Sequence, residues 1–281
     1  MYKCGLVLEG GGTRGIYTAG ILDAFIEKGI EFPYVIGVSM GASNGVSYLG
    51  KNARRQHDII MDYINDRRFL SFEKIVKNRE IVDSEWLFGD LAFDEIPVNT
   101  DELKRAKTVF CCVVTNAQTG KAEYLYPDLD SEGSFPEVQA SGALPIMTKG
   151  IEIGGEVYFD GGVSDSIPLE KALDDGCIKA VTVLTQHKGF VKKPYNENLL
   201  KTIRKYPLLR EALRDRHNMY NAELDYVRMI EAQGRTMVIQ PPTELDCSTL
   251  ENSTAKLEAI YRLAYKQGLE VADNVREYIN S

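Results

Sequence analysis

Residues Val35-Ile36-Gly37-Val38-Ser39-Met40-Gly41 decide the fold of this chain, because an apolar run typical of a buried strand passes into a sharp turn and then into a helix. A serine at such a junction is held in a strained conformation, with its hydroxyl above the edge of the sheet. Gly37 and Gly41 lack the side chains that would collide where strand and helix cross, and the helix N-terminus favours developing negative charge. The pattern predicts that Ser39 is a nucleophile; the alternative is a serine that merely caps the following helix.

The elements on either side of this turn alternate between strand and helix. Before it we predict a strand at residues 6–8, a glycine-rich loop and a helix at 16–28, which Gly29 ends. After it, Met40 to Leu49 has a helical pattern. The alternation of strand, helix, strand and helix predicts an α/β fold with a mainly parallel sheet and helices packed against it.

The rest of the chain continues the sheet and then becomes mainly helical. Gly154-Gly155 is a two-residue hairpin signal between two short strands. We predict helices at 198–231, with a break near Pro207, and at 255–279, and strands at 109–114, 121–126, 151–153, 157–159, 180–184 and 236–239. Residues 1–190 are predicted to form the catalytic α/β domain, and residues 191–281 a mainly helical C-terminal part packed on it.

The glycine loop Gly10-Gly11-Gly12-Thr13-Arg14-Gly15 follows the first strand and opens a helix. It is a literal G-x-G-x-x-G, which is also the pattern of a dinucleotide site. Such a site needs an acidic residue at the end of the second strand, where this chain has the serine motif instead. The other use of the loop is as an oxyanion hole, because successive glycines let backbone N–H groups point to one place.

Asp160-Gly161-Gly162 stands at the end of the predicted hairpin strand. A carboxylate at a strand end can be aimed rigidly at the crevice in which Ser39 is expected. Asp-Gly is also a common turn pair, so a purely structural turn is the alternative.

Together these motifs resemble the patatin-like phospholipases, whose signature is a G-G-G-x-R/K-G loop, a G-x-S-x-G nucleophile and a later D-G-G or D-G-A. Residues 140–145 (ASGALP) look like the family's A-S-x-A-x-P segment. Residues 164–168 (SDSIP) resemble its D-N-x-P stretch, with Ser166 in place of Asn. The resemblance covers about residues 5–185 and implies a patatin-like three-layer sandwich. One departure is Glu9, where many members have Asp or Ser; we expect no effect of it on catalysis.

The resemblance implies a serine lipid-acyl hydrolase with a Ser39–Asp160 dyad. The N–H groups of Gly11 and Gly12 would form the oxyanion hole, and no metal or cofactor would be needed. Arg14, at the family's basic position, would either pair with a phosphate headgroup or brace the loop through a carboxylate. Two other functions remain open: a patatin fold kept as a non-catalytic lipid-binding module, and an α/β-hydrolase esterase. The second needs a catalytic histidine, for which only His57, His187 and His217 are available.

Composition limits the classes of partner. The formal net charge of −8 argues against nucleic-acid binding. No apolar run reaches the ~18 residues of a membrane span, and the N-terminus has no signal-peptide core, so we expect a cytoplasmic location. The cysteines are scattered and are expected to be buried thiols: Cys4, Cys111, Cys112, Cys177 and Cys247.

Residues 188–217 are strongly basic. They hold three acidic residues, Glu197, Glu211 and Asp215, against nine cations: Lys188, Lys192, Lys193, Lys201, Arg204, Lys205, Arg210, Arg214 and Arg216. A charge run is often a solvated helix face, but in a protein that acts on lipids this segment is also a candidate for peripheral contact with an anionic membrane surface.

Overall fold

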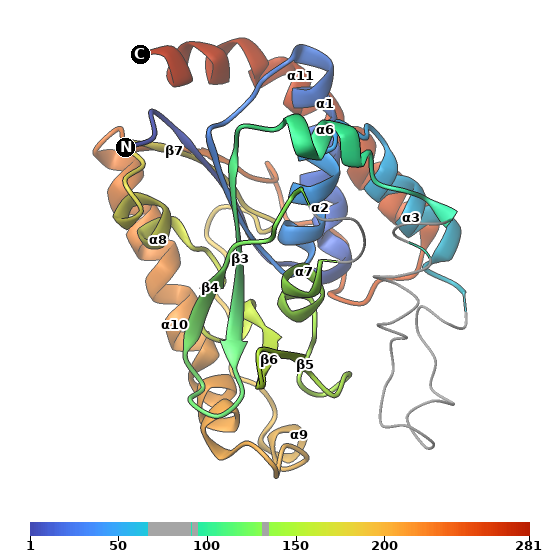
Figure 1. Cartoon of the computed structure of the whole chain (residues 1–281), viewed down its shortest axis with the longest axis vertical. Helices are drawn as coiled ribbons and strands as arrows, with labels where there is room; N and C mark the ends of the chain where they lie inside the picture. The colour runs from blue at the N-terminus through green and yellow to red at the C-terminus, as the bar shows by residue number, and fades with distance from the viewer. Residues whose placement is uncertain (67–90, 92–94, 131–134) are drawn as a thin grey trace.

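The computed structural model describes residues 1–66, 91, 95–130 and 135–281 (Figure 1). Its strands form one eight-stranded sheet in the order β5-β6-β3-β2-β1-β7-β8, with β4 paired to β3. The strands are β1 Gly5–Leu8, β2 Tyr34–Val38, β3 Val109–Asn116, β4 Ala122–Leu125, β5 Ile151–Ile153, β6 Glu156–Asp160, β7 Ala180–Val183 and β8 Thr236–Ile239.

The centre of the sheet is parallel. β3, β2, β1, β7 and β8 run in the same direction, while β4, β5 and β6 pair antiparallel. The register pairs Leu8 with both Gly37 and Val183. The carboxyl ends of β1, β2 and β7 therefore lie side by side, and the loops that follow them leave from one edge. The predicted α/β fold with a mainly parallel sheet is confirmed.

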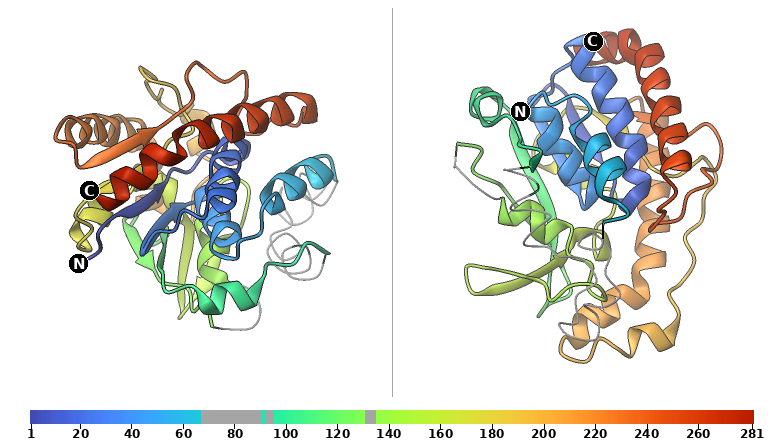
Figure 2. Two further views of the ribbon diagram at one scale, coloured as in Figure 1. Left: turned by 90° about the horizontal axis from the view of Figure 1, so that it is seen from above. Right: turned by 90° about the vertical axis from the view of Figure 1, so that its right-hand side faces the viewer.

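Helices cover both faces of the sheet (Figures 1 and 2). One face carries α1, α2, α3, α6 and α11, and the other carries α8 and α10. The helix bounds are α1 Ile16–Lys28, α2 Met40–Leu49, α3 Arg55–Tyr63, α6 Thr100–Arg105, α7 Pro136–Ser141, α8 Leu169–Asp174, α9 Glu197–Leu200, α10 Pro207–Ala232 and α11 Thr254–Asn280. The break near Pro207 extends over residues 201–206.

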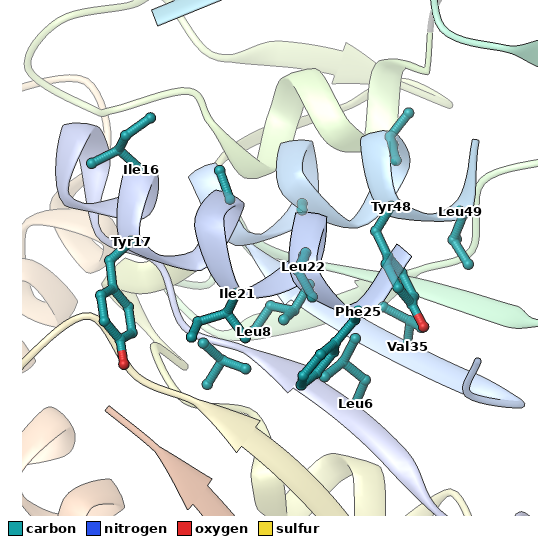
Figure 3. Close-up of a cluster of buried hydrophobic side chains, with 14 of the residues drawn as sticks. Leu6, Leu8, Ile16, Tyr17, Ile21, Leu22, Phe25, Val35, Tyr48 and Leu49 are labelled. Atoms are coloured by element: carbon teal, nitrogen blue, oxygen red, sulfur yellow. The ribbon is translucent and has the colours of Figure 1, made fainter. Parts of the chain in front are cut away.

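The strand residues alternate between two apolar cores, as the period of a strand requires. Leu6 and Leu8 pack under α1 in the first core (Figure 3), whereas Val7 packs in the second. Cys112 and Cys111 likewise lie in the first and second core. The cysteines are free thiols, and all are buried except Cys247, which is only half-buried and so departs from the expectation.

The C-terminal helix α11 packs closely on α1, side by side in Figures 1 and 2. A Cβ added at Gly20 of α1 would lie 2.6 Å from the carbonyl oxygen of Tyr261, and one at Gly268 of α11 would lie 2.7 Å from the Cβ of Ala24. Two glycines thus permit an approach that larger residues would prevent. In the described part of the chain, every helix is too short or too polar to cross a bilayer.

Candidate active site

Ser39 occupies the turn between β2 and α2 with φ 55° and ψ −124°, a conformation that non-glycine residues rarely adopt. Its N–H donates to the hydroxyl of Ser141 at 2.8 Å, and that hydroxyl donates to the carbonyl oxygen of Val113 at 2.7 Å. The Ser39 side chain makes no capping bond to α2, although the residue stands at the N-cap. The hydroxyl is therefore not used as a helix cap.

The two glycines of the motif are required by close backbone contacts. A Cβ at Gly41 would lie 2.5 Å from the carbonyl oxygen of Leu8 and 2.8 Å from that of Glu9. A Cβ at Gly37 would lie 2.7 Å from the backbone nitrogen of Ala42. Both distances are below normal van der Waals contact, so the helix can cross the strands only without these side chains.

Asp160 ends β6, and its side chain is buried. Oδ1 of its carboxylate accepts the N–H of Gly162 at 2.7 Å, and its own N–H donates to the carbonyl oxygen of Ala143 at 2.8 Å. Burial raises the pKa of Asp160, while a hydrogen bond from the Ser39 side chain and the charge of Arg216 lower it. The structure therefore brings the predicted serine and carboxylate together. Asp160 also stabilises the turn that follows it, through its bond to the Gly162 N–H, which is the structural role given above as the alternative.

The glycine loop presents free N–H groups beside this pair. The N–H of Gly10 donates to the Ser166 carbonyl at 3.4 Å, and that of Thr13 donates to the Thr249 carbonyl at 3.0 Å. Between them, the N–H groups of Gly11 and Gly12 make no hydrogen bond with any described residue. Gly12 has φ 57°, and a Cβ there would collide with the Thr249 carbonyl.

Glu9, directly before the glycine loop, ties this part of the chain to two distant segments. Its buried carboxylate accepts the N–H of Thr185 at 2.5 Å and the hydroxyl of Tyr220 at 2.5 Å. Burial raises the pKa of Glu9, and these two donors lower it. Glu9 thus joins the start of the glycine loop to the end of β7 and to α10, a contact that the sequence pattern did not indicate.

The residues of the three predicted motifs line one cavity of about 530 Å³. Of the motif residues, it is lined by Gly10, Gly11, Gly12, Arg14, Ser39, Asp160 and Gly162. The other motif residues, Thr13, Gly15, Gly37, Gly41 and Gly161, stand beside these in the same three turns but outside the lining.

The rest of the cavity wall consists mostly of residues to which sequence reasoning gave no role in the site. Most of the remaining wall is apolar: Leu144, Pro145, Ile146, Met147, Val163, Leu199, Leu213 and Leu250. Lys192, Tyr195 and Arg216 bring polar groups from the basic segment, which the sequence suggested only as a surface. Leu144 and Pro145 belong to the ASGALP segment quoted from the sequence, and Val163 follows the Asp160-Gly161-Gly162 turn. The residues from Lys192 onward reach the cavity only through the fold, and no local pattern indicates that they line it.

None of the three histidines lines this cavity. His57 is buried, with Nδ1 2.7 Å from Asp58 and Nε2 2.7 Å from Glu258. Nδ1 of His217 lies 3.1 Å from the Arg214 carbonyl oxygen, and His187 packs edge-on against Phe190. The geometry offers no histidine partner for Ser39, as a triad would require.

Comparisons with known proteins agree with these features. A family model described as patatin-like phospholipase matches residues 6–173, and one described as a domain of unknown function, DUF6363, matches residues 206–280. The chain is 30% identical to the uncharacterized protein YjjU of Escherichia coli over 65% of this chain and 52% of that protein. It is 28% identical to lysophospholipase nte1 of Aspergillus terreus over 97% of this chain and 18% of that protein.

The chain thus spans about half the length of the first of these relatives and less than a fifth of the second. Among solved structures, VipD from Legionella pneumophila aligns with a TM-score of 0.46 at 15% identity, covering 96% of this chain and 67% of that one.

Proposed function

The chain belongs to the patatin-like phospholipase family, and from that premise we propose that it is a serine lipid-acyl hydrolase acting through a Ser39–Asp160 dyad. The observation that carries the proposal is the shared cavity, on which a serine in a strained strand–turn–helix junction lies beside a buried carboxylate. The name of the Aspergillus relative, lysophospholipase, supports a lipid ester as the substrate.

In the proposed mechanism Asp160 accepts the proton of the Ser39 hydroxyl as the oxygen attacks the ester carbonyl. The carbonyl π electrons move to oxygen, and a tetrahedral oxyanion forms. Collapse of this intermediate breaks the bond to the alcohol, which leaves with the proton that Asp160 returns. Water then attacks the acyl-serine with Asp160 again as base, releasing the fatty acid and regenerating Ser39.

The oxyanion would be stabilised by the N–H groups of Gly11 and Gly12. Both glycines line the cavity and their N–H groups have no partner among the described residues, whereas the N–H groups of Gly10 and Thr13 donate to carbonyl oxygens. Donors fixed before the reaction stabilise developing charge without reorganising, which makes such groups effective in acyl transfer. The apolar wall from Leu144 to Met147 is suited to the acyl chain.

The experiment that tests the proposal is the substitution Ser39→Ala. An active-site fluorophosphonate should label the wild-type protein at Ser39, and the variant should lose both labelling and hydrolysis of a short-chain ester and of lysophospholipids. Ser43→Ala, on α2 outside the cavity lining, is the matched control. A folded Ser39→Ala protein with full hydrolysis would refute the nucleophile, and a wild-type protein that binds lipid without cleaving it would favour the non-catalytic module.

We also propose that the mouth of the cavity contacts an anionic membrane surface. Leu199 and Leu250 line the cavity and are 40% and 47% exposed, and Val191 nearby in the chain is 65% exposed. The basic segment 188–217, which contains Val191 and Leu199, also carries exposed cations: Lys188, Lys193, Lys201, Arg204 and Lys205. Apolar side chains beside cations favour binding to an anionic lipid interface. Lys192, in contrast, lies on the cavity and not on this surface.

A further inference from the structure

Helix α10 belongs to the region that matches a domain of unknown function, and it lies beyond the part of the chain that the phospholipase family model matches. The helix packs on one face of the sheet (Figure 1), and its inward side carries three polar side chains, Arg216, Tyr220 and Glu223. They are spaced four and three residues apart, which places them on one side of a helix. Polar groups that face the protein interior need partners there.

The outer side of α10 provides the contrast. Asp225 and Arg228 are exposed and pair with each other at 2.9 Å within the helix. Such a surface pair contributes little to stability. Arg216, Tyr220 and Glu223 instead bond to residues that are 54, 211 and 57 positions away in the sequence.

Arg216 and Glu223 bind the two ends of the turn that follows Asp160. Nε of Arg216 donates to the carbonyl oxygen of Gly162, whose own N–H donates to Oδ1 of Asp160 at 2.7 Å. The carboxyl group of Glu223 accepts the backbone N–H groups of residues 166 and 167, each at 3.1 Å. Two side chains of α10 therefore hold the segment that carries the proposed base.

Tyr220 bonds to the other half of the site. Its buried hydroxyl donates to Oε1 of Glu9 at 2.5 Å, and Oε2 of Glu9 accepts the N–H of Thr185 at 2.5 Å. Glu9 stands directly before the glycine loop, in which the N–H of Gly10 donates to the carbonyl oxygen of Ser166 at 3.4 Å. The loop is thus connected to α10 through Tyr220 and to the turn that α10 also holds.

The charges around these contacts compensate one another. Burial raises the pKa of Asp160, and the charge of Arg216 opposes this effect. Burial likewise raises the pKa of Glu9, and the charges of Lys192 and Arg14 oppose it. Carboxylates and cations buried together hold each other in place, because moving one would leave the other without its partner. The cluster is therefore suited to fixing the backbone around it.

We infer that Arg216, Tyr220 and Glu223 are positioning residues, through which α10 holds the base-bearing turn and the glycine loop in register with the nucleophile. The inference rests on the proposed hydrolase function and gives the region of unknown function a role in it. Tyr220 and Glu223 lie outside the cavity lining, so they act through the backbone that they hold. Such support matters because a base and oxyanion donors need placement within about 0.5 Å.

Tyr220→Phe is the most direct test, because it removes one hydroxyl and keeps the ring. The ring packs edge-on against Phe190 and under the amine of Lys192, and Phe retains both contacts. Complete loss of one oxyanion donor lowers kcat by about 10²–10³, so a displaced loop should lower kcat for a short-chain ester about tenfold. KM should stay within about twofold, because the apolar wall is unchanged. Tyr226→Phe, the same change farther along α10 and outside the cavity lining, should alter neither constant.

Two readouts separate placement from stability. Each kcat value is divided by the fraction of protein that an active-site fluorophosphonate labels, so that unfolded molecules do not count. A trifluoromethyl ketone, whose tetrahedral adduct with Ser39 carries an oxyanion, should bind Tyr220→Phe about tenfold more weakly, in proportion to kcat/KM. The effects of Tyr220→Phe and Glu9→Gln on kcat should not add, since both break one contact. Additive effects, or an unchanged kcat per labelled molecule, would overturn the inference.

Glu223 offers a second pair of variants. Burial raises its pKa and the neighbouring Asp165 raises it further, so the side chain carries a proton. Glu223→Gln keeps an oxygen for the backbone N–H groups and a donor for Asp165, and should retain kcat within about twofold. Glu223→Leu keeps neither and should lower kcat about tenfold, whereas Glu231→Leu, exposed on α10, should not. Equal kcat in the Gln and Leu variants would overturn the inference, and if the Leu variant does not fold, Tyr220→Phe decides it.

The inference and the proposed function can fail separately. A wild-type protein that cleaves esters, with variants that keep its kcat, leaves the function standing and overturns the positioning role. If the wild-type protein cleaves no ester, the proposed function fails, and hydrogen exchange of residues 9–15 decides the placement. Faster exchange in Tyr220→Phe than in Tyr226→Phe then supports a loop held by α10, and equal exchange overturns it.

Discussion

The substitution Asp160→Asn tests the dyad most directly, because it changes the chemistry of the side chain and little else. Asn has the same shape, and its Oδ1 can still accept the N–H of Gly162, which lies 2.7 Å from the carboxylate in the wild type. The change also removes a buried negative charge whose pKa burial already raises. The variant should therefore fold, with a Tm equal to that of the wild type or higher.

The expected loss of activity follows from the role of a general base. An amide nitrogen facing the Ser39 hydroxyl cannot accept its proton, so the serine loses its activation. Positioned bases contribute about 10²–10⁴ to the rate, which corresponds to roughly 3–5 kcal/mol of transition-state free energy. We expect kcat for a p-nitrophenyl ester to decrease by at least ~10², with KM nearly unchanged.

Two controls accompany this measurement. Asp174→Asn, an exposed aspartate at the end of α8, should retain wild-type kcat. In a double variant, His187→Gln with His217→Gln, kcat should stay within a few-fold of the wild-type value, since neither histidine lines the cavity.

In acid, wild-type activity should decrease as Asp160 takes up a proton, at a pH above the ordinary aspartate pKa of 3.8. A folded Asp160→Asn protein whose kcat stays within tenfold of the wild type would refute the dyad.

Three further predictions concern the fold and the surface. Gly41→Ala should destabilise the protein by about 1–3 kcal/mol in urea unfolding, because its Cβ would lie 2.5 Å from the Leu8 carbonyl oxygen; an unchanged midpoint would contradict this contact. Burial and the neighbouring Asp165 raise the pKa of Glu223, so the folded protein holds a proton that the unfolded chain releases, and stability should decline as the pH rises above the ordinary value of 4.5. Glu223→Gln should make this decline of stability with pH less steep. An equally steep decline in the variant would contradict the proton uptake by Glu223. Exchanging five exposed cations for Gln should abolish sedimentation with anionic vesicles at low salt, since each contributes up to ~1 kcal/mol to binding. These cations are Lys188, Lys193, Lys201, Arg204 and Lys205. A wild-type protein that does not bind such vesicles would rule out the membrane contact.

Sequence reasoning succeeded where the determinants are local. The predicted bounds of α1 and α2 match the structure, because Gly29 ends α1 in a left-handed conformation and the serine turn begins α2. The parallel sheet followed from alternating apolar strands and amphipathic helices. The predicted division of the chain at residue 190 and the catalytic roles of Ser39 and Asp160 remain predictions.

What the sequence could not provide is long-range placement. Lys192 and Arg216 read as part of one surface charge run, yet they reach the cavity while Arg214 between them pairs at the surface. Ser141 lies 102 residues from Ser39, whose N–H it accepts, and no spacing rule predicts that contact. Glu9 looked like a neutral departure from the family motif, but it binds residues 176 and 211 positions away.

The contact between Thr13 and the 248–251 loop has a consequence for synthesis of the protein. Thr13 bonds to Thr249 across 236 residues of sequence, and this loop also crowds Gly12. A ribosome adding ~5–20 residues per second needs roughly 12–47 s to cover that distance. During this interval the glycine loop lacks its contact with the 248–251 loop. Lys192 and Arg216, which also line the cavity, leave the ribosome only late in synthesis. A nascent chain therefore cannot display the assembled cavity until most of its length has been synthesised.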